Sequence, residues 1–117
     1  MQAKFVYAIK FVADMDRALA FYRDTVGLTV KFATPFWSEF DTGDVTLALH
    51  PASERNPAGG VQLGFTAPDL PAIYAAREAA SLTFSAPPME EHGVLLSRLV
   101  DCEGAEVSLS GTSAAQG

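Results

Sequence analysis

The sequence predicts an α+β fold in which two β-α-β-β-β modules lie in one domain and form a curved, mixed sheet around a central cleft. An internal repeat is the first reason, because one extended run leads into a helix at Asp14 and a second leads into a helix at Asp69. The second reason is a hairpin pattern in each half, with the first hairpin turning near Gly43. Two copies of an open sheet bury themselves most fully by closing around a shared cleft.

The first module is expected at about residues 4–50 and begins with a strand and a helix. Residues 5–12 are rich in aromatic and β-branched side chains, which favour a strand. Asp14 is expected to cap the helix, and Gly27 to end it in a left-handed conformation. The apolar side chains with the three-four spacing of one buried helical face are Met15, Ala18, Leu19, Tyr22 and Val26.

Proline and glycine delimit the remaining elements. The first module is expected to finish with strands at 28–33, 36–42 and 45–50. A polar connector at 51–60 precedes the second module, which spans about 61–110. Its expected elements are a strand at 61–66, a helix at 69–80, a strand at 82–85, a loop at 86–93 and hairpin strands at 94–100 and 105–110. Residues 111–117 are small and polar and are expected to form a loose tail.

Composition and charge narrow the class of protein. With 117 residues, 49% of them hydrophobic, the chain suits one core and is too short for two independent ones, so residues 1–117 are expected to form a single domain. Eight Lys and Arg stand against 14 Asp and Glu without a basic stripe, which argues against a nucleic-acid partner. The lone Cys102 excludes an intramolecular disulfide. No signal sequence or long apolar run is visible, so we expect a soluble, cytoplasmic protein without a membrane partner.

Several residues now give the chain a resemblance to a known family. They are Asp14, Met15, Phe21, Tyr22, Gly27 and Leu28 around the first helix, repeated in part around the second, and the run from Asp101 to Gly104 before the last strand. The pattern spans roughly residues 4–110 and resembles the glyoxalase, bleomycin-resistance and extradiol-dioxygenase superfamily, the vicinal oxygen chelate proteins. The resemblance implies a glyoxalase-like fold. It implies no single function, because this fold hosts lyases, isomerases, dioxygenases, thiol transferases and metal-free drug-binding proteins.

The resemblance also implies where a metal would bind. Metal-dependent members place His or Gln before the Asp that opens each helix, and Glu in the last strand of each module. The matching positions in this chain are Tyr7, Gln62, Ala48 and Ser108. Only Gln62 could coordinate a divalent ion, and one amide oxygen is a poor site. The chain is therefore expected to hold no metal and no other cofactor at these positions.

Strand alternation predicts which side chains of the first hairpin line the cleft. The side expected to pack on the helix carries Phe36, Phe40, Val45, Leu47 and Leu49. The side expected to line the cleft carries Trp37, Glu39, Thr46, Ala48 and His50. If Asp41 pairs with Asp44, Trp37 lies opposite Ala48 and Glu39 lies opposite Thr46.

The first strands of the two modules follow the same alternation, with one exception. In the second module, Val61, Leu63 and Phe65 are expected on the helix side, with Gln62, Gly64 and Thr66 on the cleft side. In the first, the cleft side carries Phe5, Tyr7, Ile9 and Phe11. Lys10 then falls on the helix side, and either a β-bulge or an edge position would account for it.

Two functions fit these residues. The favoured one is a non-catalytic binder, resembling the bleomycin-resistance branch, that holds a small planar aromatic or cationic molecule against Trp37, with Glu39 and His50 as polar contacts. The alternative is a lyase or isomerase, cofactor-free or metal-dependent, that uses His50 as general acid or base and Gln62 or Tyr7 as hydrogen-bond donor. The expected ligand contacts are Tyr7, Trp37, Glu39, Thr46, Ala48, His50, Gln62 and Ser108. With eight Phe, three Tyr and one Trp, the chain has more large apolar side chains than one thin core would hide, so a homodimer is expected.

Overall fold

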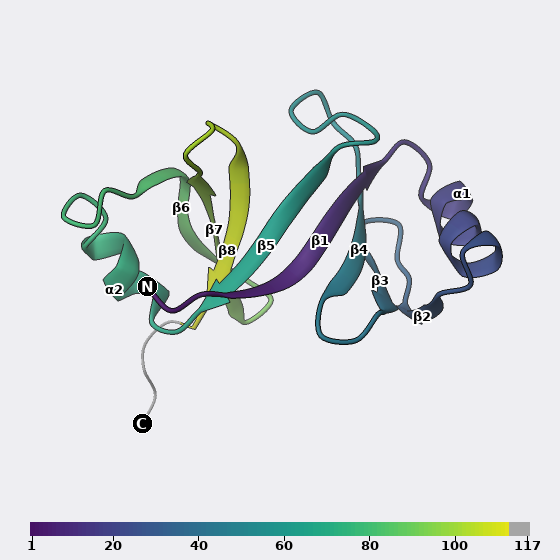
Figure 1. Ribbon diagram of the computed structural model, residues 1–117, viewed down its shortest axis with the longest axis horizontal. Helices are drawn as coiled ribbons and strands as arrows, with labels where there is room; N and C mark the ends of the chain where they lie inside the picture. Colours follow the sequence, from purple (N-terminus) through teal and green to yellow (C-terminus); the bar gives the residue numbers. More distant parts are fainter. Residues whose placement is uncertain (113–117) are drawn as a thin grey trace. The chain divides into compact units, whose positions relative to one another are not determined.

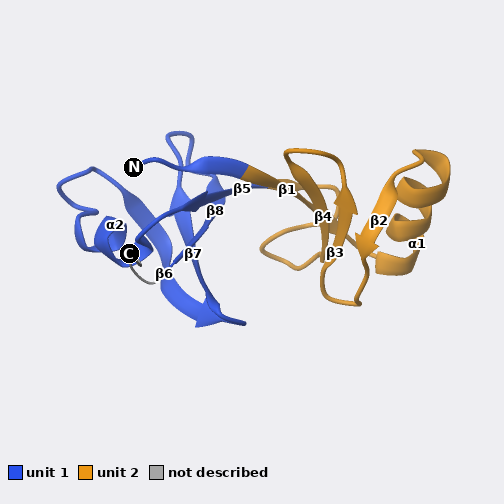
Figure 2. Cartoon of the chain, turned by 90° about the horizontal axis from the view of Figure 1, so that it is seen from below, with its two compact units in different colours: residues 1–5, 63–117 blue, residues 6–62 orange. Residues whose placement is uncertain are grey.

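The chain forms two compact units. The computed structural model describes residues 1–112, so most of the expected tail, 113–117, lies outside the described residues. One unit is Val6–Gln62, and the other combines Met1–Phe5 with the residues from Leu63 onward (Figure 1, Figure 2). We call Val6–Gln62 the first unit (orange in Figure 2, where the key reads unit 2) and the other the second unit (blue, unit 1 in the key). The element order β-α-β-β-β occurs twice along the chain, so the predicted α+β fold class is confirmed.

The sheet of the first unit is mixed. Its strands, in spatial order, are β2 (Thr29–Phe32), β3 (Ser38–Asp41), β4 (Thr46–Pro51) and β1 (Lys4–Val12). β1 runs parallel to β4, whereas β3 is antiparallel to both of its neighbours. Parallel pairing of β1 with β4 requires a crossover, and the helix and the β2–β3 hairpin lie within it.

The two faces of this sheet are both covered by apolar side chains. Phe40 and Leu49 are fully buried, and the Phe40 ring lies 5.9 Å from the Tyr22 ring of the helical segment. On the other face, Ile9, Phe11 and Ala48 form a second buried cluster. The predicted alternation is therefore confirmed in β3 and β4.

The first helix starts as predicted and ends differently. The Asp14 side chain accepts a 3.0 Å hydrogen bond from the Arg17 amide and caps α1 (Met15–Ala20). The chain then continues as a π-helical turn, η1 (Phe21–Thr25), in which the Val26 amide donates to Phe21 O at 3.0 Å. This wider turn rotates Val26 off the buried face, so its predicted burial is wrong and its side chain is exposed. Gly27 ends the segment at φ +90°, as predicted.

The first hairpin has a different register from the predicted one. Glu39 lies opposite Ala48, and Phe40 lies opposite Leu47. This shift in register leaves every side chain on its predicted face of the sheet. The turn is longer than expected because the Thr42 hydroxyl donates to Val45 O and accepts from the Leu47 amide.

Phe36 is a second correction in this hairpin. The Thr34 hydroxyl oxygen accepts hydrogen bonds from the amides of Phe36 (3.2 Å) and Trp37 (2.9 Å), which makes a turn before β3. Phe36 is therefore 76% exposed and does not pack on the helix.

The second unit repeats this topology. Its strands, in spatial order, are β5 (Val61–Ala67), β8 (Glu106–Gly111), β7 (Val94–Val100) and β6 (Thr83–Glu91), with α2 (Leu70–Ala75) after β5. β5 is parallel to β8, and the other pairs are antiparallel. Its core is Ala67, Leu70 and Leu109, with partly buried Phe65, Ile73, Phe84, Leu95 and Leu99 around them. Gly111 belongs to β8 and not to the expected tail.

Two predicted boundaries in the second unit are wrong. The expected loop at 86–93 is mostly strand, because β6 continues through Pro87 and Pro88 to Glu91. Proline has no amide hydrogen, but β6 pairs only with β7 in the order above, so the missing donors disrupt no second ladder. The helix α2 stops at Ala75 and turns follow, because the residues after it are mostly exposed and offer no buried face to extend it.

The helix side of β5 is also only partly as predicted. Leu70 packs with Ala67 at the end of β5, and the Tyr74 ring lies 4.9 Å from Phe84 on β6. The beginning of β5 is not covered, so Val61 and Leu63 are exposed while Gln62 and Gly64 are buried.

Candidate functional site

Three predicted ligand contacts of the first unit form one hydrogen-bonded network. The Trp37 indole Nε1 donates to Glu39 Oε2 at 2.8 Å. The Tyr7 hydroxyl donates to the same oxygen at 3.4 Å, and the Tyr7 and Trp37 rings meet edge to face, 5.6 Å between centroids. These contacts fix the orientation of both rings on the sheet.

Glu39 is the charged centre of this network and is only 7% exposed. Its other carboxylate oxygen, Oε1, lies 3.8 Å from Lys31 Nζ, whose side chain reaches solvent. The pKa of the Tyr7 hydroxyl is raised, mainly by burial and then by the nearby Glu39 carboxylate, because both disfavour a phenolate. The Tyr7 hydroxyl therefore remains a hydrogen-bond donor across the physiological pH range.

Lys31 is a residue of this site that the sequence analysis missed. The β2–β3 register shifts between Val30 and Phe32, which places Lys31 in an irregularity of the strand. Such a shift changes the face toward which a side chain points, and simple alternation contains no signal for it.

His50 completes this surface next to the Trp37 ring. The centroids of the Trp37 and His50 rings are 6.2 Å apart. On the neighbouring strand β1, the centroid of the Phe11 ring lies 5.6 Å from that of His50. His50 Nδ1 is 2.8 Å from Pro51 O. A carbonyl oxygen only accepts, so Nδ1 carries the proton and Nε2 of a neutral ring is free to accept one. We call Tyr7, Trp37, Glu39, Ala48 and His50 together the Trp37 face.

Within this face, Ala48 is fully buried opposite Glu39. The remaining predicted contacts lie around or outside the face. Thr46 is paired with Tyr7 in the β1–β4 register and is half-buried. Gln62 is buried near the start of β5. Ser108 belongs to the second unit, where it is half-buried on β8 opposite Gly64.

The four positions implied for a metal do not form a ligand set in this chain. Ala48 has no donor atom, and the Tyr7 hydroxyl is hydrogen-bonded to Glu39. Among residues 1–112, no three His, Cys, Asp or Glu side chains are grouped so as to hold a metal ion. The side chains present therefore do not fit the metal site of the metal-dependent members.

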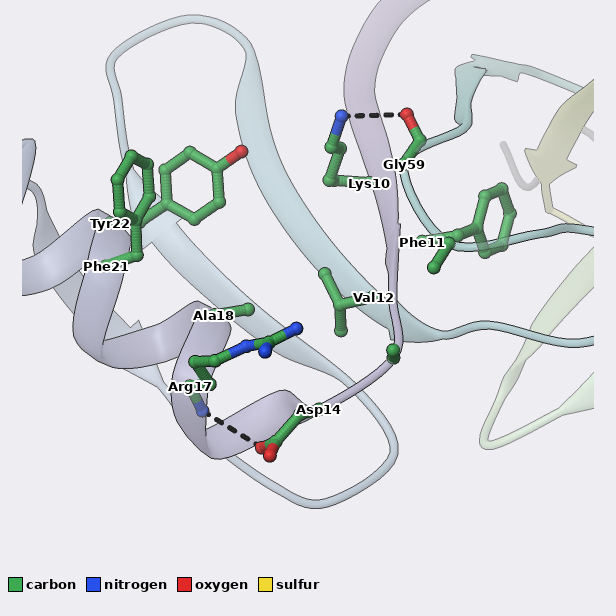
Figure 3. A pocket seen from close by; sticks show the side chains of 11 residues that line it. Lys10, Phe11, Val12, Asp14, Arg17, Ala18, Phe21, Tyr22 and Gly59 are labelled. Atoms are coloured by element: carbon green, nitrogen blue, oxygen red, sulfur yellow. Dashed lines mark hydrogen bonds between the residues drawn. The ribbon is translucent and has the colours of Figure 1, made fainter.

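Lys10 lies on the opposite face of β1, beside a pocket that the sequence analysis did not predict. It pairs with Leu49 in a regular register, so neither a bulge nor an edge position explains it. Its ammonium group donates to Gly59 O at 2.8 Å, and the residue lines a pocket of about 320 Å³ between β1, the helical segment and the loop at 58–59 (Figure 3). Strand alternation placed the charged Lys10 on the helix side of β1 without a reason, and this was the sequence signal for the pocket.

The fold and the repeat define an α+β protein of paired β-α-β-β-β modules. The family model of the Glyoxalase/Bleomycin resistance protein/Dioxygenase superfamily matches residues 4–109, and the chain belongs to this superfamily. Within the described residues, no helix has the length and apolar character needed to cross a membrane.

Solved structures support the same fold at low sequence identity. A superfamily member from Vibrio splendidus is 16% identical, with a TM-score of 0.67 over 94% of this chain and 99% of that one. Methylmalonyl-CoA epimerase from Mycobacterium tuberculosis is 14% identical, with a TM-score of 0.74 over 92% and 87%. The epimerase from Streptomyces coelicolor, in complex with 2-nitronate-propionyl-CoA, is 20% identical, with a TM-score of 0.70 over 95% and 98%. No curated protein matches the sequence.

Proposed function

We propose that this protein binds a small planar aromatic molecule on the Trp37 face without the help of a metal. The observation that carries the proposal is the buried Glu39 carboxylate, which accepts hydrogen bonds from Trp37 and Tyr7 and fixes both rings before a ligand arrives. Rings held in place in this way lose little conformational entropy on binding. Such a surface suits stacking or edge contacts with a second ring.

The charge of the preferred ligand depends on Lys31. A free carboxylate beside an indole would favour a cation, as the sequence alone suggests. Lys31 already lies within 3.8 Å of Glu39, so a ligand cation has to displace it. We therefore propose that aromatic character decides binding and that a positive charge on the ligand adds affinity only when Lys31 is removed.

Other features of the proposal rest on the superfamily and the residue types. Thr46 and Gln62 are proposed as further ligand contacts in the first unit, and Ser108 as a ligand contact of the second unit, because their positions correspond to the cleft side of the sequence pattern. The absence of suitable donors at Tyr7 and Ala48 supports binding without a metal. A cytoplasmic location and a homodimer are part of the same proposal.

Fluorescence of the single tryptophan tests the proposal directly. A panel of neutral and cationic planar aromatics should change Trp37 emission saturably, and pretreatment with a chelator should leave the midpoint unchanged. By calorimetry, Trp37→Ala should weaken binding by about two- to thirtyfold, the equivalent of 0.5 to 2 kcal/mol of ring contact. Lys31→Gln should improve binding of the cationic members of the panel over the neutral ones.

Phe36 provides the matched control. It is the aromatic neighbour of Trp37 in the sequence but is 76% exposed and outside the Trp37 face, so Phe36→Ala should leave affinity unchanged. If the whole panel leaves the emission constant, or if both alanine variants weaken binding equally, the Trp37 face is not the binding site.

A lyase or isomerase is the second candidate, and the contact of the His50 ring with Pro51 O supports it. Pro51 O accepts from Nδ1 and leaves Nε2 for proton transfer, and two of the solved structures named above are of epimerases. If the protein converts a substrate, His50→Ala should lower kcat about a hundredfold and change substrate affinity little. In a pure binder the same change should cost only a few-fold in affinity, and no turnover should be found.

A further inference from the structure

The helix side of the first unit contains a pocket whose walls combine cations with aromatic rings. β1 contributes Lys10 and Val12, the helical segment contributes Arg17, Ala18, Phe21 and Tyr22, and the loop at 58–59 closes one side (Figure 3). Its volume of about 320 Å³ lies near the lower end of the range for small-molecule sites. None of the five residues of the Trp37 face is in its lining, but Phe11, whose ring lies beside His50, also borders it.

The charges in the pocket favour an anion. Lys10 donates one hydrogen bond to Gly59 O and keeps two further N–H donors. In the described part of the chain, the Arg17 guanidinium makes no ion pair. The one acidic group in the lining, Asp14, accepts the Arg17 amide as the helix cap. The lining therefore carries two cations and one carboxylate, with Lys10 turned toward Gly59 and Arg17 nearer to Asp14 (Figure 3), in a chain that carries six net negative charges overall.

Phe21 and Tyr22 form the apolar wall. Both line the pocket, with their rings edge to face at 5.2 Å. Phe21 begins the π turn, and such turns are frequent at functional sites. The exposed Phe21 ring therefore has a position suited to a ligand ring.

We infer that this pocket binds a small aromatic carboxylate, with its carboxylate toward the Arg17 guanidinium and its ring against Phe21 and Tyr22. A guanidinium makes charge-assisted hydrogen bonds to a carboxylate and offers the matching planar geometry. The site is separate from the Trp37 face, and the inference does not depend on the function proposed for that face.

Three probes with one ring and different head groups test the inference: phenylacetate, neutral 2-phenylethanol and cationic phenethylammonium. In ¹⁵N-edited NMR titrations, phenylacetate should shift the Ala18 and Gly59 amides saturably and leave the Trp37 indole N–H in place. The neutral and cationic probes should bind at least about fivefold more weakly, as expected when the charge-assisted bonds are lost.

Substitutions distinguish the contribution of the Arg17 charge to binding from that of the open space in the pocket. Arg17→Gln should weaken phenylacetate about three- to tenfold without changing 2-phenylethanol, whereas Arg23→Gln, the same change in net charge outside the pocket, should alter neither. Ala18→Leu should fill the pocket and abolish binding while all charges remain. Equal affinity for the three probes, an unchanged Kd in Arg17→Gln, or shifts of the Trp37 indole alone would each overturn the inference. The last of these results would support the Trp37 face instead.

Discussion

Glu39 determines the geometry of the Trp37 face because one of its oxygens is the shared acceptor for two side chains. A buried carboxylate is costly unless its oxygens are paired, and here the Trp37 indole, the Tyr7 hydroxyl and the Lys31 ammonium surround it. Strand alternation predicted the side of the sheet on which Glu39 lies. It could not predict that Tyr7 reaches Glu39, which depends on the true registers of β1 with β4 and of β4 with β3, or the ion pair with Lys31, which depends on the irregularity in β2.

Tyr7 should make the stability of the fold sensitive to alkaline pH. Burial, with the Glu39 carboxylate second, raises its pKa above the ordinary 10.0. The folded chain then holds the phenolic proton more tightly than the unfolded chain, so this contribution to the free energy of unfolding is complete below pH 10 and is lost as the pH rises through the raised pKa. Urea unfolding between about pH 8 and pH 11 should show a steeper loss for the wild type than for Tyr7→Phe.

Glu39→Gln serves as the control for the cause of this shift. It removes the negative charge and keeps an amide oxygen as acceptor, so its alkaline slope should fall between those of the wild type and Tyr7→Phe. Identical slopes for the wild type and Tyr7→Phe would show that Tyr7 titrates alike in the folded and unfolded chains.

At the scale of elements, the sequence predicted the existence and type of each strand and helix better than their ends. The repeat and the capping residues Asp14 and Gly27 were sufficient for the first helix, but nothing in its apolar spacing indicated a π turn at Phe21. β6 was missed beyond Ser85 because Pro87 and Pro88 are typical of loops. An edge strand tolerates them, and the edge position is a property of the whole sheet that no local pattern contains.

Gly111 tests how closely two elements of the second unit approach each other. A methyl group at this position would overlap Ala67 O on the paired strand and would lie 3.1 Å from Leu70 Cβ. Neither neighbour can retreat without disturbing the β5–β8 ladder or the fully buried Leu70. Gly111→Ala should therefore lower the free energy of unfolding by about 1–3 kcal/mol, measured by urea denaturation.

Asparagine substitutions distinguish a lack of space from a need for unusual backbone angles. Gly27 has φ +90° and no atom within 4 Å of an added Cβ, so Gly27→Asn should be tolerated at a cost below about 1 kcal/mol. Gly111→Asn should be worse than Gly111→Ala, because it adds volume where the space is already filled. If Asn is tolerated better than Ala at Gly111, the close approach of β8 to Ala67 is wrong.

At the scale of the whole molecule, the fold was more predictable than the surface chemistry. The internal repeat was enough to predict two β-α-β-β-β modules, since each copy constrains the interpretation of the other. The pocket beside Lys10 was not predicted, although its signal was a charged residue on the apolar side of a strand. Alternation can show that a residue is misplaced, but only the packing of α1 and the loop at 58–59 shows what surrounds it.

Assembly is the last prediction, and β5 suggests where two chains would meet. Along this strand the usual pattern is reversed: Val61 and Leu63 are 57% and 44% exposed, while Gln62 between them is buried. Exposed apolar side chains in a row favour a protein partner, and a second copy of the chain would cover both strips by symmetry. Light scattering at micromolar concentration should give twice the 12.4 kDa chain mass. Leu63→Lys should shift the equilibrium toward monomer, whereas Met89→Lys, an equally charged change at an exposed residue on β6, should not. A monomer mass for the wild type contradicts the dimer, and equal effects of the two substitutions contradict an interface at β5.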